Sequence, residues 1–311
     1  MWRACPPVTI RTKSRYRNDG KTAYISNYGA FGGAGGGPTI SVVDLTAQRA
    51  FRPIDLGALR AAHGLAFGGG KLYFTAEEAN LVGRYDPSSQ KIDWVMGTGQ
   101  NRTHMVVVSK DLNAVFTSNV SSASVSILEL GTVQPLGFGR GPGGTGGGAP
   151  GGVGRGRGGP PRSEWKVSNV AVGRGSEGFD LSPDGKELWV ANAQDQTVSI
   201  VDVSSKEVVQ TIGSTKAANR PKFTPDGKNV FMSDLQGNEL LVFDAATRRE
   251  FKKIALQGNS EGILIAPDGA HAYAAENSRD AVAVIDLKTM AVSGEVKTGR
   301  WPDGLAWAVR R

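Results

Sequence analysis

The sequence predicts an all-β protein built from one repeated unit of four strands. The tripeptide Pro-Asp-Gly begins at Pro183, Pro225 and Pro267, so 42 residues separate successive copies. Each copy precedes a β-rich run such as Leu188 to Asn192, then a run that ends in aspartate, then a fourth short run. Four strands in about 40–45 residues are typical of one blade of a β-propeller.

The tripeptide has the residues that a tight hairpin turn requires. Proline presets φ, aspartate accepts hydrogen bonds from its own local backbone, and glycine adopts the left-handed conformation. The flanking runs alternate β-branched or aromatic residues with polar or small ones, as half-buried strands do. A single blade cannot bury both of its faces, so we expect adjacent blades to stack on one another.

Weaker copies of the turn extend the repeat to six units. The six turns lie at positions 19, 69, 111, 184, 226 and 268. We therefore expect a single propeller domain over residues 18–311, preceded by an atypical basic segment over residues 1–17. Aromatic residues at the same place in each second strand are expected to be core: Tyr24, Tyr73, Phe116, Trp189, Phe231 and Tyr273.

The two ends of the chain do not complete a blade in an obvious way. Residues 301–309 repeat only the first, innermost strand of a unit, while residues 1–17 contain at most one weak strand at Val8 to Ile10. Propellers usually close by letting one terminus complete the blade that the other begins. We expect a seven-bladed template that is incomplete at its N-terminus. The alternative is a closed six-bladed ring in which residues 301–309 displace residues 8–17.

The net charge of +7 is concentrated outside the repeats. Residues 1–17 contain five Lys or Arg and no acid, and residues 137–163 contain four Arg and no acid, so the remainder is slightly acidic. This distribution argues against a nucleic-acid-binding blade face. The Gly/Pro/Arg-rich residues 137–163 are expected to be a disordered, dispensable insertion between two strands.

No apolar run is long enough for a membrane helix, and the N-terminus shows no signal peptide. The single cysteine, Cys5, excludes an internal disulfide and a cysteine-based zinc site. We expect a monomer that binds an unknown protein or small-molecule ligand and no nucleic acid.

One aligned position could have a chemical function. It lies at the start of each innermost strand, which in a propeller is the mouth of the central channel. Its residues are polar throughout, and Arg220 follows one of them: Thr12, His63, His104, Glu177, Asn219, Glu261 and Asp303. All but Thr12 are candidate ligand-binding residues.

Histidine and carboxylate side chains around one axis suit a divalent metal, for which the candidates are His63, His104, Glu177, Glu261 and Asp303. A polar residue is also expected at any water-filled mouth, and glycines at the next position, such as Gly64 and Gly178, suggest a backbone requirement. We assign no catalytic residue and no certain cofactor, with a divalent metal as the open possibility.

The strand Tyr24 to Asn27, the strand Leu188 to Asn192 and the three Pro-Asp-Gly turns resemble the YVTN-repeat β-propellers. The resemblance implies a seven-bladed, periplasmic or secreted protein. It leaves three functions open. We favour a non-enzymatic binding module. The alternative is a lactonase-like hydrolase that uses a metal or a His/carboxylate pair at the mouth, with a carboxylate as general base. A redox or haem-associated propeller ranks third.

Overall fold

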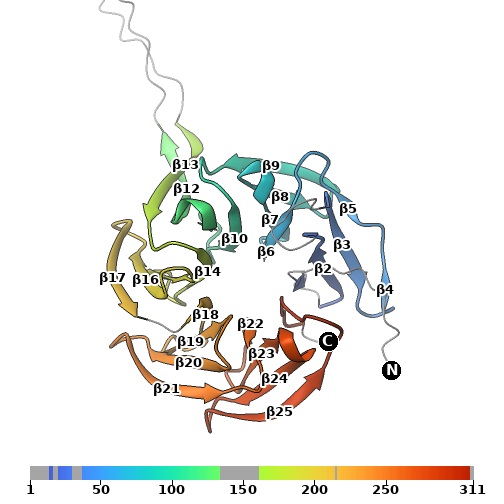
Figure 1. The fold of residues 1–311 in the computed structure, drawn as a ribbon. Helices are drawn as coiled ribbons and strands as arrows, with labels where there is room; N and C mark the ends of the chain where they lie inside the picture. The colour runs from blue at the N-terminus through green and yellow to red at the C-terminus, as the bar shows by residue number, and fades with distance from the viewer. Residues whose placement is uncertain (1–13, 17–19, 30–36, 134–160, 214–215, 309–311) are drawn as a thin grey trace, which may run out of the picture.

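The computed structural model describes residues 14–16, 20–29, 37–133, 161–213 and 216–308. Their strands form six antiparallel sheets arranged in a ring, and the sheets follow one another around the ring in chain order (Figure 1). This arrangement confirms the predicted all-β propeller and corresponds to the six-bladed ring. None of the helices in these residues is long and apolar enough to span a membrane.

Blades 2 to 6 each contain four consecutive strands, and each strand pairs with the next. Blade 2 consists of β6 (Ala62–Gly68), β7 (Lys71–Ala76), β8 (Leu81–Asp86) and β9 (Lys91–Gly97). Blade 3 consists of β10 (Thr103–Val108), β11 (Ala114–Asn119), β12 (Ser124–Val133) and β13 (Arg162–Ala171). Blade 4 consists of β14 (Ser176–Leu181), β15 (Glu187–Asn192), β16 (Thr197–Asp202) and β17 (Glu207–Gly213). Blade 5 consists of β18 (Ala218–Phe223), β19 (Asn229–Asp234), β20 (Glu239–Asp244) and β21 (Arg249–Ala255). Blade 6 consists of β22 (Ser260–Ile265), β23 (His271–Glu276), β24 (Ala281–Asp286) and β25 (Ala291–Lys297).

Short 3-10 helices connect the second and third strands of three blades: η1 (Glu77–Ala79), η2 (Val120–Ser122) and η3 (Asn277–Arg279). Each ends on a residue in the left-handed conformation.

Blade 1 departs from the four-strand pattern at its outer edge. It contains β1 (Ser14–Tyr16), β2 (Thr22–Ser26), β3 (Thr39–Asp44), β4 (Arg49–Ala50) and β5 (Ile54–Asp55). Both β4 and β5 pair with β3, so the fourth strand is present in two pieces. Pro53 lies in the gap between them and cannot donate to the ladder. The innermost strand β1 comes from the segment that the sequence analysis set apart as basic.

The C-terminal segment is not the lone strand that we expected. Residues 302–308 have no regular secondary structure. They still lie beside blade 6, because a Cβ at Gly262 would be 1.8 Å from the carbonyl oxygen of Asp303, and the ring of Trp307 contacts that of Tyr273 at 5.8 Å. Tyr273 is nevertheless only half-buried, whereas the other five aromatic residues predicted to be core are buried. Most of the predicted insertion 137–163 lies outside the described residues, and Arg162 already belongs to β13.

The turns at one face of the ring, called here the turn face, follow the predicted chemistry. Gly185 of the first Pro-Asp-Gly copy has φ +79°, and Asp184 accepts a hydrogen bond from the backbone N–H of Lys186. At the same face, the aspartate that ends each third strand except that of blade 3 accepts backbone N–H bonds in the following turn: Asp44, Asp86, Asp202, Asp244 and Asp286. These aspartates therefore stabilise turns.

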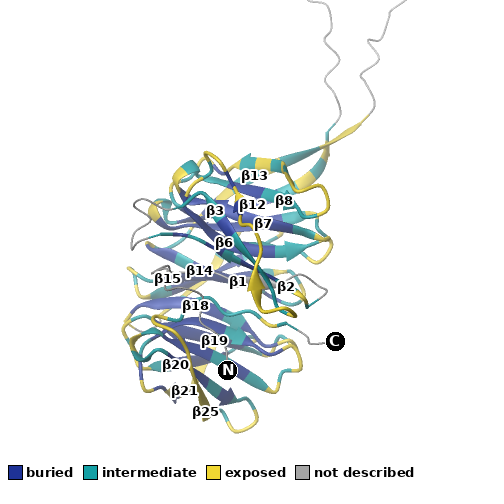
Figure 2. Cartoon of the chain, turned by 90° about the vertical axis from the view of Figure 1, so that its right-hand side faces the viewer, coloured by how far each residue is buried: buried dark blue, intermediate teal, exposed yellow. Residues whose placement is uncertain are grey.

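The hydrophobic core lies between blades. Five clusters of buried side chains each combine residues of two adjacent blades, one for each junction from blades 1 and 2 to blades 5 and 6. Trp189 of blade 4, for example, packs edge-on against Phe223 and Phe243 of blade 5. Each such side chain contributes about 2 kcal/mol when it is removed from water. Figure 2 shows the result, with buried inner strands and an exposed outer layer.

Candidate functional site

The mouth lies at the face opposite the turn face, where each innermost strand begins. In blades 2 to 6 the innermost strand has a register shift at this point, such as that between Ala218 and Pro221. The irregularity includes the aligned candidate residue and the residue after it. A bulge of this kind changes the direction of a side chain relative to a regular strand and is common beside functional sites.

The residue after the candidate position is glycine in three blades because the next blade is very close. A Cβ at Gly64 would be 2.6 Å from the carbonyl oxygen of His104, and a Cβ at Gly178 would be 2.3 Å from that of Asn219. Real Cβ contacts are not this short, so no other residue fits without a shift of the backbone. The glycines that the sequence analysis linked to a backbone requirement do have one.

Hydroxyl groups fix the same backbone from the other side. Thr75 Oγ1 donates to the carbonyl of His104 at 2.7 Å, and Ser118 Oγ donates to the carbonyl of Glu177 at 2.8 Å. Ser26 and Ser233 donate in the same way to the carbonyls of His63 and Glu261. Each of these four candidate residues is therefore held by the second strand of the preceding blade.

Two histidines from adjacent blades meet at this position. The imidazole rings of His63 and His104 stack with centroids 3.6 Å apart and planes 21° apart, and both residues are about 95% buried. Nδ1 of His63 lies 3.3 Å from the backbone carbonyl of His104. Tyr28 of blade 1 packs edge-on against His63 at 4.6 Å.

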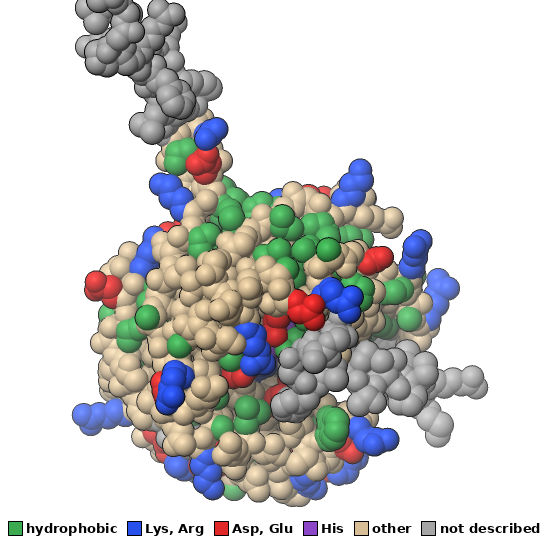
Figure 3. Space-filling view, turned by 45° about the horizontal axis from the view of Figure 1, so that its top comes forward, with side chains coloured by type: hydrophobic (Ala, Val, Ile, Leu, Met, Phe, Trp, Pro, Cys, Tyr) green, Lys and Arg blue, Asp and Glu red, His purple; other side chains and the backbone are tan. Residues whose placement is uncertain are grey.

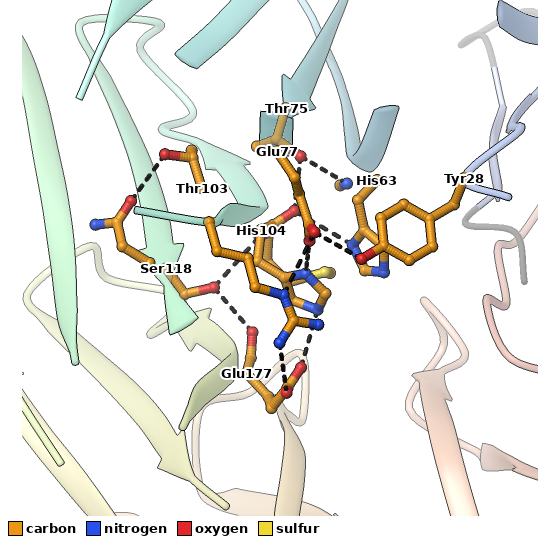
Figure 4. Close-up of polar contacts among 12 residues, drawn as sticks. Tyr28, His63, Thr75, Glu77, Thr103, His104, Ser118 and Glu177 are labelled. Carbon is orange, nitrogen blue, oxygen red and sulfur yellow. Dashed lines mark hydrogen bonds and ion pairs between the residues drawn. The ribbon is translucent and has the colours of Figure 1, made fainter. Parts of the chain in front are cut away.

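His104 lies between two carboxylates (Figure 4). Its Nδ1 contacts Glu77 of blade 2, and its Nε2 lies 3.0 Å from Glu177 of blade 4. Arg102 contacts the same two carboxylates, at 3.4 Å and 3.9 Å. The hydroxyl of Tyr28 donates to Glu77 at 2.6 Å. The mouth therefore holds a continuous charged network across blades 1 to 4, and Figure 3 shows acidic and basic side chains gathered near the centre of this face.

The network determines the protonation of its members. Burial alone would lower the pKa of His104, but the charges of Glu77 and Glu177 raise it above its usual value. Burial would raise the pKa of Glu177, but His104, Arg102 and Arg220 lower it to about 2. Burial and the neighbouring Glu77 raise the pKa of Tyr28. The two carboxylates thus favour the protonated form of the imidazole that lies between them.

The remaining candidates lie around the same mouth but belong to a second set of contacts. Asn219 donates to the backbone carbonyl of Glu261 at 3.0 Å, and Asn277 donates to the Glu261 carboxylate at 2.8 Å. Asn219, Glu261 and Asp303 are all buried. Thr12, at the aligned position of the first unit, lies outside the described residues.

Sequence reasoning missed Glu77, Arg102 and Tyr28. Glu77 directly follows the second strand of blade 2, and the register pairs Ala76 with Ala62, so Glu77 lies opposite Ala61, at the same end of the blade as His63. Alignment of the ends of the second strands, as well as the starts of the first strands, would have found it. His63, Glu77 and His104 each offer one ligand atom, and these three atoms lie within 4.8 Å of one another.

A family model and solved structures both match this chain. Residues 144–272, less than half of the chain, match the family model described as "Cytochrome D1 heme domain". The matched residues run from blade 3 into blade 6 and include Glu177, Asn219, Arg220 and Glu261. The fold is similar to that of hydrazine synthase from Kuenenia stuttgartiensis, with a TM-score of 0.71 and 15% identity over 98% of this chain and 93% of that chain. A search of curated proteins gave no match.

The family match corrects the expectation about cofactors. The sequence analysis expected no certain cofactor and left only a divalent metal open, whereas the model that matches is that of a haem domain. The haem-associated propeller ranked only third from the sequence, because no haem-attachment motif is present in the chain.

Proposed function

We propose that this propeller binds a haem-type tetrapyrrole at the channel mouth. The observation that carries the proposal is the match of residues 144–272 to the Cytochrome D1 heme domain. The function proposed here is not the one favoured from the sequence. There a non-enzymatic binding module ranked first and the haem-associated function third.

The donor chemistry at the mouth fits such a group. Imidazole is the commonest protein ligand of haem iron. Because both ring nitrogens of His104 contact carboxylates, an iron ligand would come from His63. Arg102, about one-third exposed at the mouth, is the cation that could pair with a carboxylate of the macrocycle. The cavity directly below the mouth has a volume of about 40 Å³, so a macrocycle would have to lie over the mouth, since sites for such molecules take roughly 300 Å³ or more.

A bound haem would supply the redox chemistry of its iron. The residues of the chain would hold and orient the ligand. His104 stacks on His63, and Glu77 and Glu177 fix the ring of His104 from both sides. Tyr28 supports the opposite side of His63 and donates to Glu77. This second layer restricts the orientation of the proposed ligand, a role that commonly tunes metal affinity.

The lactonase-like hydrolase is less well supported by the same geometry. A general base should have a pKa near the working pH. Glu177 has a pKa of about 2, far below that range, and the carboxylates that raise the pKa of His104 favour its protonated form, which cannot accept a proton.

Three further expectations remain part of the proposal. A YVTN-type assignment is supported by the asparagines that end three second strands, Asn27, Asn119 and Asn192, which all donate to Ser or Thr side chains of the third strand. A periplasmic or secreted location follows from that assignment. We also propose that the chain acts as a monomer.

Titration of the purified protein with haemin tests the proposal. We expect a shifted Soret band that saturates at one haemin per chain. His63→Gln should weaken binding by about tenfold or more, because it removes the iron ligand. His271→Gln, which changes the histidine at the turn face, is the control and should bind like the wild type. Haemin binding that does not saturate, or equal binding by the His63 and His271 variants, would contradict the proposal.

A further inference from the structure

Arg220 occupies a position where the repeat otherwise avoids a large polar side chain. It is the residue that follows the candidate position in blade 5, where blades 2, 4 and 6 have Gly64, Gly178 and Gly262 and blade 3 has Met105. Its backbone N–H donates to Ser233, as the backbone N–H of Gly64 donates to Thr75. The backbone therefore has the same arrangement in blades 2 and 5, and blade 5 carries a guanidinium group at this position.

This guanidinium is buried without hydrogen-bond partners for two of its nitrogens. Arg220 is 7% exposed, and its Nε and Nη1 atoms have no hydrogen-bond partner among the described residues. Arginine cannot lose its proton in a protein, so burial leaves it charged. Glu177 is influenced by the charge of Arg220, but it forms its ion pairs with His104 and Arg102.

The side chain lines a small cavity inside the central channel. The cavity has a volume of about 40 Å³, and its wall includes Leu65, Val106, Phe179, Ile263 and Leu305. These apolar groups offer no hydrogen-bond acceptor. The second cation at the wall, Lys222, is already paired with Asp180 at 2.7 Å. The cavity therefore presents guanidinium N–H donors that have no hydrogen-bond partner among the described residues.

We propose that the channel contains an anion-binding site formed by Arg220. The space is slightly larger than the ~30 Å³ that one water molecule occupies in the liquid, so the ligand is a small monovalent anion of one to three heavy atoms, such as a halide or a small carboxylate. A buried cation with unpaired donors attracts such an ion strongly, because charge-assisted hydrogen bonds are strong in a low-dielectric site. The proposal does not rest on haem binding, since it is argued from the guanidinium group and the cavity that it lines.

Chloride is the first probe, with gluconate as an anion too large for the cavity. We expect the Tm of the haem-free protein to rise with chloride concentration when gluconate keeps the ionic strength constant, because a ligand that binds only the folded state stabilises it. Formate should act like chloride. The ³⁵Cl NMR line of chloride should broaden in the presence of the protein, and formate should reverse the broadening.

Arg220→Met replaces the side chain by a shorter, unbranched apolar one and removes the charge. It should weaken chloride binding by about tenfold or more in both assays, because the principal donor is lost. Arg174→Met, which removes an exposed arginine paired with Asp195, is the control for general charge effects and should bind chloride like the wild type. If Arg220→Met does not fold, the comparison of chloride and gluconate in the wild type still tests the proposal. Equal Tm values in the two salts, or broadening that persists in a folded Arg220→Met variant, would overturn the proposal.

Discussion

The two faces of the ring differ in which part of the repeat recurs from blade to blade. At the turn face the residue type recurs, and each recurring aspartate accepts N–H groups of its own turn. At the mouth the backbone recurs and the residue type varies: His63, His104, Glu177, Asn219 and Glu261 occupy equivalent positions. A side chain that recurs from blade to blade thus indicates a residue that the fold requires. A position where the side chain varies on a recurring backbone is one where the fold does not require a particular residue.

The largest expected effect comes from breaking the close approach of blades at the mouth. Gly64→Ala places a Cβ 2.6–2.8 Å from three backbone atoms of blade 3 and should lower the free energy of unfolding by about 3 kcal/mol. Gly97→Ala, in β9, meets nothing within 4 Å and serves as the control. Chemical denaturation measures both. Similar stability of the two variants would show that the blades can separate without cost.

Removal of one charge from the network at the mouth should have the second largest effect. Glu77→Gln leaves the contacts of His104, Tyr28 and Arg102 without a carboxylate and should cost about 2 kcal/mol, because hydrogen bonds to buried charged groups are strong. The neighbouring Glu78→Gln removes only an exposed pair with Arg60 at 3.5 Å and should change stability little. A loss of stability that is equal in both variants would argue against a coupled network.

The pH dependence of the haem-free protein should reveal His104. Since its pKa is raised in the folded state, its contribution to stability is complete below a pH of about 6.5 and is lost as pH rises through the folded-state pKa. The difference in stability between the wild type and His104→Gln should therefore decrease with rising pH above that point. Urea denaturation at several pH values measures this difference. A difference that stays constant up to pH 9 would contradict a protonated imidazole.

The smallest effect is expected at the turn face. Asp202→Asn keeps an oxygen acceptor for the N–H of Ser205 and changes only an exposed charge. Its Tm should be the least changed of the variants in this series, as differential scanning calorimetry would show. A decrease as large as that of Glu77→Gln would remove the distinction between the two faces.

Much of the fold followed from the repeat because turn and strand signals are local. The turns at Asp184, Asp226 and Asp268 and the innermost strand starts needed only spacing and residue type. The predicted strand at 301–309 is absent from residues 302–308, because strand formation depends on partners that a sequence pattern does not supply. β1 was missed for the same reason, since Ser14 to Tyr16 is a strand only through its pairing with β2.

The sequence predicted where the mouth lies, but not the network of ion pairs and hydrogen bonds that forms there. Alignment placed His63, His104 and Glu177 at equivalent positions, and they are in contact through ring stacking and a 3.0 Å ion pair. The partners that set their protonation, Glu77 and Arg102, lie in connections between strands where the repeat is irregular. The unpaired nitrogens of Arg220 could not be inferred from spacing, because spacing does not show whether the neighbouring blades offer a hydrogen-bond acceptor to them.

The hydroxyl contacts at the mouth have a consequence for how this ring can change over time. Thr75 and Ser118 hold the main chain of the following blade. The backbone at His104 and Glu177 therefore keeps its position when the side chain there is replaced. A single codon change there replaces the group at the mouth while the main chain keeps its position, and it also alters the ion pairs of the network. The same property makes the mouth a suitable set of positions for a combinatorial library, in which each blade contributes one variable residue to a common ligand.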